Sequence, residues 1–303
     1  MKKAWRIIWK IALACGVVGI ALTLVGLKQG LPADVAFDRT GAHVVFSHDL
    51  NSDETMDQPF KAIDVNVSVC DVKVVTGTRY GITVVWPNTT RLITWWYDAT
   101  TLTVRESGPN LLMQWHSSSG TIIITVPADA NLANINVYTA TGDINVEAAA
   151  DRTVLQTSTG DVRLGADAAT QADLISSTGN LAVTADVASL RASTSTGDVT
   201  ASGRFGDVNA SSSTGTVAVS GSASLVNATS STGDVRLTLD STWDAVSYDF
   251  HTDTGRITVA GPGAPQISSG AFQLSYPGDR PSAPPFLSAA SDTGNISVTL
   301  GGA

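Results

Sequence analysis

Short segments of this chain alternate hydrophobic and polar residues. Between residues 63 and 69, every second position holds a branched residue, at Ile63, Val65, Val67 and Val69. A period of two is typical of a β-strand that buries one face. More strand-like runs follow, separated by turn residues, at 81–86, 91–97, 101–106 and 121–127. This pattern predicts an all-β protein.

From residue 135 onward, the alternation is organised by a repeat. The heptapeptide STGDVRL occurs twice, at 158–164 and 231–237, and a Thr-Gly pair recurs throughout. The repeat glycines are Gly142, Gly160, Gly179, Gly197, Gly215, Gly233, Gly255 and Gly294. Five of their seven spacings lie within one residue of eighteen, and the last two are 22 and 39 residues. This period predicts a single-stranded parallel β-solenoid, in which each repeat forms one coil of about 18 residues.

Aligning the repeats on their glycines identifies the positions that face inward. The second residue after glycine is always a branched aliphatic: Ile144, Val162, Leu181, Val199, Val217, Val235, Ile257 and Ile296. The fourth is also aliphatic, and the residue between them is charged, polar or small. This predicts a strand with one buried face. Five residues before glycine, half of the repeats have alanine, which predicts a thin interior.

The glycines predict the corners of the coils. Glycine adopts turn conformations that a side chain would obstruct, and we expect the threonine before it to form a ladder of stacked hydroxyls. Stacked strands expose edges at both ends, so the stack needs caps. We assign a β-rich N-terminal cap to 59–134 and the solenoid repeats to 135–303. The Pro- and Gly-rich segment 261–290 is interpreted as an insertion before the last coil.

The N-terminal segment departs from the β pattern. Residues 11–27 carry no charge, are about long enough to cross a bilayer as a helix, and follow four basic residues. This arrangement predicts a cytoplasmic tail at 1–10, a transmembrane signal anchor at 11–27 and a polar spacer at 28–58, with everything after the anchor outside the cytoplasm. A cleaved signal peptide is the alternative, although no small-x-small cleavage site follows Leu27.

Charge and composition narrow the function classes. After Leu27 the chain has 14 basic and 27 acidic residues, so its formal charge there is 14 − 27 = −13. An acidic exterior does not support a nucleic-acid partner. The two cysteines, Cys15 and Cys70, fall in the predicted anchor and the exterior part, so no disulfide joins two exterior segments.

Three stretches together resemble a known bacterial family. They are FKAIDVNVSVCDVKVV at 60–75, GTIIITVPADANLANINVYTATGDINV at 120–146, and the run of STGDV units. The family is called domain of unknown function 4097, or "putative adhesin", and the resemblance covers residues 59–300. It implies a β-solenoid displayed at the bacterial surface, anchored here in the cell membrane, and it brings no catalytic residue set.

The residue after each repeat glycine is often Asp or Asn, as at Asp143, Asp161, Asp198 and Asp234. Recurring aspartates on a β-roll can bind calcium, and aspartate pairs can cleave polysaccharides. Here they repeat with the architecture, and turns favour Asx residues, so we interpret them as solvated turn residues. No HExxH, GxSxG or phosphate-loop motif is present. We therefore predict no enzyme activity, no metal site and no cofactor.

Aromatic residues gather in the predicted cap. Trp95, Trp96 and Trp115 form a candidate ligand surface, because exposed rings can stack on sugars or on a partner protein. The alternative, which we favour, is that these rings form the core of the cap. Adjacent residues of a strand point to opposite faces, so one of Trp95 and Trp96 is expected outside.

These observations predict a non-catalytic, membrane-anchored extracytoplasmic protein that acts as an adhesin or a cell-envelope scaffold. Its expected partners are the membrane and a cell-wall glycan or an envelope protein. The repeated Ser, Thr and Asp edges would present many weak contacts in one register. The alternative is an accessory component of envelope-stress sensing that signals to a membrane partner through the N-terminal helix.

Overall fold

The computed structural model describes residues 33–38, 41–46, 48–89, 91–98, 100–108, 119–266, 272–275 and 285–301. The predicted transmembrane anchor at 11–27 and Trp115 lie outside these residues. Within them, no helix has the length and hydrophobicity needed to span a bilayer. The chain divides into two compact units. In the smaller unit, β1 (Ala33–Asp38) and β2 (Gly41–Phe46) form an antiparallel pair.

The larger unit consists of residues 50–86, 91–107 and 119–303. Its first strands are β3 (His48–Met56), β4 (Ala62–Val67), β5 (Cys70–Gly77), β6 (Tyr80–Thr89), β7 (Leu92–Tyr97), β8 (Thr101–Ser107) and β9 (Gly120–Pro127). The regular repeats follow as β10 (Leu132–Thr141), β11 (Ile144–Val146), β12 (Ala150–Thr159), β13 (Val162–Leu164), β14 (Ala168–Thr178), β15 (Leu181–Thr184), β16 (Val187–Thr196), β17 (Val199–Thr214), β18 (Val217–Thr232) and β19 (Val235–Leu239). The final elements are the 3-10 helix η1 (Trp243–Ala245), β20 (Ser247–Thr254), β21 (Ile257–Ala260), β22 (Gln273–Ser275), β23 (Phe286–Thr293) and β24 (Ile296–Leu300).

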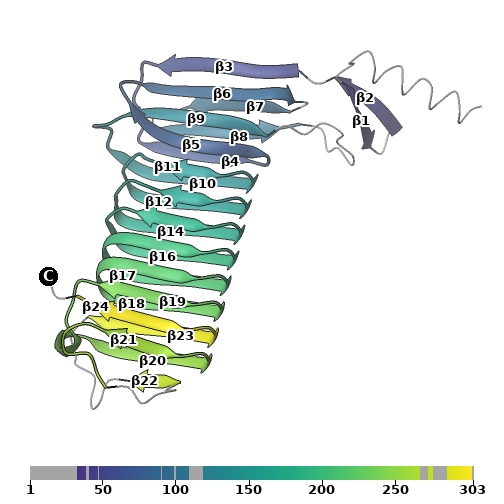
Figure 1. Ribbon diagram of the computed structural model, residues 1–303. Helices are drawn as coiled ribbons and strands as arrows, with labels where there is room; N and C mark the ends of the chain where they lie inside the picture. The colour runs from purple at the N-terminus through teal and green to yellow at the C-terminus, as the bar shows by residue number, and fades with distance from the viewer. Residues whose placement is uncertain are drawn as a thin grey trace, which may run out of the picture. The chain divides into compact units, whose positions relative to one another are not determined.

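Each repeat forms one coil with a corner at its Thr-Gly pair. The strand before the glycine pairs in parallel with its counterpart in the next repeat, as β10 does with β12 and β12 with β14. The strand after the glycine does the same, so that Ile144 lies opposite Val162 and Val162 opposite Leu181. Figure 1 shows these coils stacked one above another. The predicted all-β class is confirmed, and the pairing between repeats is parallel.

The predicted inward positions form the core. All eight residues two positions after the repeat glycines are at most 3% exposed. The column five positions before glycine is equally buried, and Ala192, Ala210 and Ala228 face no solvent at all. Small side chains let the two strands of a coil approach closely, because interiors are packed without voids. The interior is therefore a narrow apolar stack that runs through all the coils.

At the C-terminal end, the order of coils in the stack differs from their order in the sequence. The last strands, β23 and β24, pair on one side with β18 and β19 and on the other with β20 and β21. The coil of Gly294 therefore lies between the coils of Gly233 and Gly255, as the yellow strands in Figure 1 show. After β19 the chain passes through η1, where Trp243 is buried, and skips one level. The last coil then fills that level.

The N-terminal end repeats this arrangement. Strand β4 pairs in parallel with both β10 and β8, and β5 pairs with both β11 and β9. The first coil, β4–β5, is thus inserted between the coils β8–β9 and β10–β11. Residues 62–127 therefore contain two further coils of the stack in addition to the strands that cover its end.

Antiparallel strands pair with the outermost coil at each end. At the N-terminal end, β7 pairs with β8 and β6 pairs with β9; at the C-terminal end, β22 pairs with β20. The sheet is therefore only partly parallel. Unpaired strand edges favour association with other chains. An antiparallel strand from the neighbouring sequence supplies the missing hydrogen bonds at little entropic cost of loop closure.

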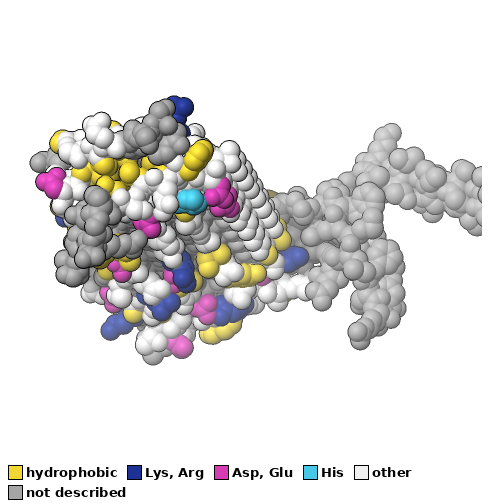
Figure 2. Space-filling model, turned by 90° about the horizontal axis from the view of Figure 1, so that it is seen from below, with side chains coloured by type: hydrophobic (Ala, Val, Ile, Leu, Met, Phe, Trp, Pro, Cys, Tyr) yellow, Lys and Arg dark blue, Asp and Glu magenta, His cyan; other side chains and the backbone are white. Residues whose placement is uncertain are grey.

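Figure 2, seen from the C-terminal end of the stack, shows acidic and basic side chains interspersed on its surface.

Candidate functional site

The repeat glycines are required by the geometry of the corner. Gly142, Gly160 and Gly179 have φ between +144° and +148°, a conformation that L side chains rarely adopt. A Cβ atom at Gly160 would lie 2.1 Å from the carbonyl oxygen of Gly142 in the preceding coil. The glycines therefore stack directly on one another, and their role is structural.

A ladder of buried hydroxyls lines the inside of the corner, at a different position from the one we predicted. The threonines directly before the glycines are exposed. The ladder lies two residues earlier, where the hydroxyls donate to carbonyls one level away. Ser176 donates to Gly160 at 3.1 Å and Ser212 to Gly197 at 2.8 Å, whereas Thr139 at the start of the ladder donates to Cys70. The ladder follows the order of the coils in the stack and not their order in the sequence. Ser291 donates to Gly233, which is 58 residues away in the sequence but only one level away in the stack.

The aspartates after the glycines form a second ladder, on the outside of the corner. The Oδ1 atom of Asp143 accepts a hydrogen bond from the amide of Asp161 at 2.8 Å, and Oδ1 of Asp161 accepts one from the amide of Asn180 at 2.9 Å. Asp198 accepts from Thr216 in the same way. Within the described residues, no group of His, Cys, Asp or Glu is arranged to hold a metal ion. The hydrogen bonds give these aspartates a structural role.

A shorter ladder of the same kind follows a second corner. Asp167 accepts from the amide of Asp186 at 2.9 Å, and Asp186 accepts from the amide of Arg204 at 2.8 Å. The side chain of Arg204 also donates to Asp186, and this hydrogen bond, followed by that from the Arg204 amide, lowers the pKa of the Asp186 carboxyl. Both groups are solvent-exposed, so we infer that this pair helps to fix the register between coils and adds little to stability.

Two of the predicted aromatic residues line a groove in the N-terminal cap. We call this the aromatic groove, and its residues are Glu54, Thr55, Met56, Asp57, Gln58, Trp95, Trp96 and Tyr97. It encloses about 520 Å³. Trp96 is 51% exposed and Tyr97 is 43% exposed. Trp95 is partly buried against the core, and its indole N–H donates to Oε2 of Glu54 at 3.0 Å.

The chemistry of the aromatic groove suits a polar ligand that has an apolar face. The exposed rings of Trp96 and Tyr97 offer flat surfaces for stacking, and Glu54 and Asp57 offer hydrogen-bond acceptors beside them. The third predicted tryptophan, Trp115, lies outside the described residues. The acidic residues of the groove, Glu54 and Asp57, come from the segment predicted to be a polar spacer. The alternation of acidic and polar residues in that segment did not predict that they would lie beside the tryptophans.

Other polar groups in the cap hold it together. Glu106, whose side chain is nearly buried, pairs with Arg91 and accepts a hydrogen bond from the amide of Val69 at 3.2 Å. The single cysteine of this region, Cys70, is buried, and burial raises the pKa of its thiol to about 12. A thiol in this state is unreactive at neutral pH, so Cys70 serves as a packing residue.

Several solved structures are similar to this chain at low sequence identity. No curated protein matches the chain. Among solved structures, a "putative adhesin" from Bacteroides fragilis shows 15% identity over 83% of this chain and 97% of its own, with a TM-score of 0.40. A "putative adhesin" from Parabacteroides distasonis shows 14% identity over the same shares, with a TM-score of 0.44. A "putative lipid binding protein" from Parabacteroides distasonis shows 11% identity over 82% of this chain and 96% of its own, with a TM-score of 0.34.

The family assignment comes from the sequence. The model of the Toastrack DUF4097 family matches residues 60–299, which include both inserted coils and every repeat glycine. This match spans most of the chain and agrees with the resemblance carried by the repeated STGDV units. The chain belongs to the Toastrack DUF4097 family.

Proposed function

We propose that this protein is a non-catalytic adhesin of the bacterial cell envelope that binds cell-wall glycan through the aromatic groove. The observation that carries the proposal is the exposure of Trp96 and Tyr97, side by side with two acidic residues. Large aromatic rings are normally buried when they serve only to stabilise a core. A ring left half in solvent beside hydrogen-bonding groups is typical of a binding surface.

The proposal includes an anchor and a display role. The uncharged segment 11–27 would hold the chain in the membrane with the coil stack outside the cytoplasm. A stack of parallel coils is rigid along its axis because every level is hydrogen-bonded to the next. The solenoid would thus keep a fixed distance between the aromatic groove and the other surfaces of the coil stack. Weak contacts made at several levels would add to the strength of attachment.

The test is sedimentation of the purified full-length chain, in detergent, with purified bacterial cell wall. The wild-type chain should sediment with the wall, and Trp96→Ala with Tyr97→Ala should weaken binding about tenfold or more, because both stacking surfaces are removed. Leu92→Ala is the matched control, since Leu92 lies in the same strand, is 52% exposed and does not line the groove.

Two outcomes would contradict the proposal. The first is wild-type binding that the double substitution leaves unchanged. The second is no wall binding at all, which would favour signalling through the N-terminal segment instead. Deleting residues 60–127 is not an equivalent test, because it also removes the coil β4–β5 that pairs with β10 and β11.

A further inference from the structure

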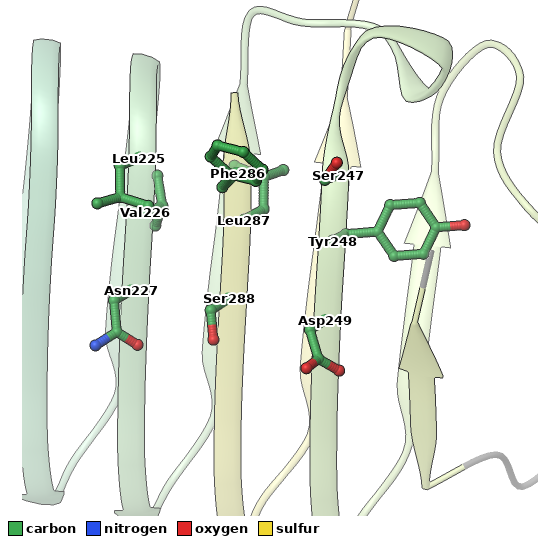
Figure 3. A pocket seen from close by; sticks show the side chains of 9 residues that line it. All are labelled: Leu225, Val226, Asn227, Ser247, Tyr248, Asp249, Phe286, Leu287 and Ser288. Carbon is green, nitrogen blue, oxygen red and sulfur yellow. The ribbon is translucent and has the colours of Figure 1, made fainter. Parts of the chain in front are cut away.

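A second pocket lies on the flank of the stack, at the level of the inserted C-terminal coil. Its walls come from β18, β23 and β20, which are three neighbouring levels, and it encloses about 470 Å³. Figure 3 shows the three strands side by side with the lining residues. Because β23 stands between β18 and β20 only in the observed stacking order, the insertion of the last coil creates this pocket.

The outward side chains of the pocket form two rows along the stack. Register places Leu225 beside Phe286, and Phe286 beside Ser247, so the first row is apolar and ends at a hydroxyl. The second row lies two residues further along each strand and consists of Asn227, Ser288 and Asp249. Residues two apart on a strand face the same side. A ligand would therefore meet an apolar row and a polar row together.

The hydroxyl at the end of the apolar row has no partner among the described residues. Ser247 is only 2% exposed, and its Oγ atom makes no hydrogen bond to any of them. A buried polar group without a partner is unfavourable, and such groups are rare in folded proteins. In the part of the chain that the structure describes, only Thr153 shares this state, and it does not line this pocket. A bound ligand with a hydrogen-bonding group would satisfy Ser247.

The pocket continues along the stack as a polar groove. A neighbouring pocket shares Leu225 and Asn227 with it and extends over β17, β16 and β14. Asp207, Asn209 and Arg191 line this extension, and no hydrogen bond or ion pair to another described residue occupies their side chains. Levels repeat at about 4.8 Å, so the groove offers hydrogen-bonding groups at regular intervals to a linear ligand.

Charge restricts the class of ligand. Asp173, Asp207 and Asp249 line the two pockets, and Arg191 is their one basic residue among those described, although Arg152 beside the groove pairs with Asp173 at 3.4 Å. An acidic groove repels anionic ligands such as phosphate headgroups or phosphate-containing polymers. The groove therefore suits a neutral chain that carries both hydroxyl groups and small apolar groups.

We propose that this flank groove binds a neutral glycan of 2-acetamido sugars, lying along the stack. The acetamido methyl group would contact Leu225 and Phe286, and its carbonyl oxygen would accept a hydrogen bond from Ser247. Ring hydroxyls would bond to Asn227 and Ser288. This second site deepens the proposed glycan-binding function, but it shares no residue with the aromatic groove.

The test is calorimetric titration of the purified full-length chain with chitotetraose and with cellotetraose, which lacks acetamido groups. Wild-type protein should bind chitotetraose about tenfold more tightly. Ser247→Ala should weaken chitotetraose binding about three- to tenfold, which is the value of one hydrogen bond, and leave cellotetraose binding unchanged. Without ligand, the same substitution should not lower the melting temperature, because it removes a hydroxyl that has no partner.

Two further variants test whether the glycan binds in the flank groove. Asn227→Ala, at an exposed position, should also weaken chitotetraose binding, whereas Ser202→Ala, at an exposed serine that lines neither pocket, should change nothing. The inference is overturned if chitotetraose does not bind, if Ser247→Ala and Asn227→Ala have no effect, or if dodecanoate binds instead. Loss of binding in Trp96→Ala alone would assign the glycan to the aromatic groove, overturning this inference while supporting the proposed function.

Discussion

Among single residues, the corner glycines have the least freedom to change. Two independent constraints act on Gly160. Its φ is +144°, and the carbonyl oxygen of Gly142 lies where a Cβ atom would be placed. The recurrence of Thr-Gly pairs predicted the corner, because no other residue adopts such a conformation readily. The pattern did not reveal that each glycine also makes room for the backbone of the preceding level.

Gly160→Ala should therefore lower the free energy of unfolding by about 2–4 kcal/mol, through backbone strain and a forced shift of the neighbouring coil. Gly165→Ala is the matched control, because a Cβ there would have no neighbour closer than 3.8 Å. It should change stability by no more than about 1 kcal/mol. Urea unfolding of both variants followed by circular dichroism measures the difference, and equal midpoints would refute the steric argument.

The two adjacent tryptophans illustrate what alternation can predict at this scale. Because neighbours in a strand face opposite sides, the sequence required different surroundings for Trp95 and Trp96. The structure agrees, with Trp95 partly buried and Trp96 51% exposed. Alternation could not predict the bond from Trp95 to Glu54, since nothing local relates residues 41 positions apart.

At the scale of elements, the hydroxyl ladder joins one coil to the next at the corner. The sequence repeats Ser or Thr at several positions before each glycine, so composition alone could not show which of them is buried. The expected position was the residue next to the glycine, whereas the structure places the ladder at the third residue before it. Strand alternation explains the result, because that residue shares the inner face with the buried position two residues earlier.

Ser212→Ala should lower the free energy of unfolding by about 1–2 kcal/mol, because it leaves the carbonyl of Gly197 without the hydroxyl that bonds to it at 2.8 Å. Ser213→Ala, at the exposed neighbouring position, should have an effect within about 0.5 kcal/mol. Denaturant unfolding under identical conditions compares the two. An equal loss in both variants would count against the ladder.

For the molecule as a whole, the main feature is the exchange of coil order at both ends. It brings together segments that are far apart in sequence: Leu225 pairs with Phe286, and Val72 with Ile144. Every level presents the same backbone groups and similar aliphatic side chains, so one coil can accept almost any other as its neighbour. The flank groove depends on this exchange, since two of its walls come from the last coil and the coil that precedes it in sequence.

Engineered cysteines test the stacking order, in a background with Cys15→Ser and Cys70→Ala. Thr229→Cys should form a disulfide with Ala290→Cys, because these positions pair directly about 4.8 Å apart. It should not do so with His251→Cys, which lies two levels away and so beyond the reach of about 7 Å. Mass spectrometry after mild oxidation reads out the bonds. The opposite pattern would show that coils stack in sequence order.

The sequence by itself determined the repeat, the inner aliphatic columns and the glycine corners, because each repeat carries its own alternation and its own turn residue. Only the tertiary structure decided which coil lies beside which, how Glu54 reaches Trp95, and where Ser247 is buried without a hydrogen-bond partner among the described residues. The physical reason is that hydrogen bonds between strand edges are nearly alike at every level. Local pattern therefore specifies a coil, whereas its place in the stack depends on the packing of the complete chain.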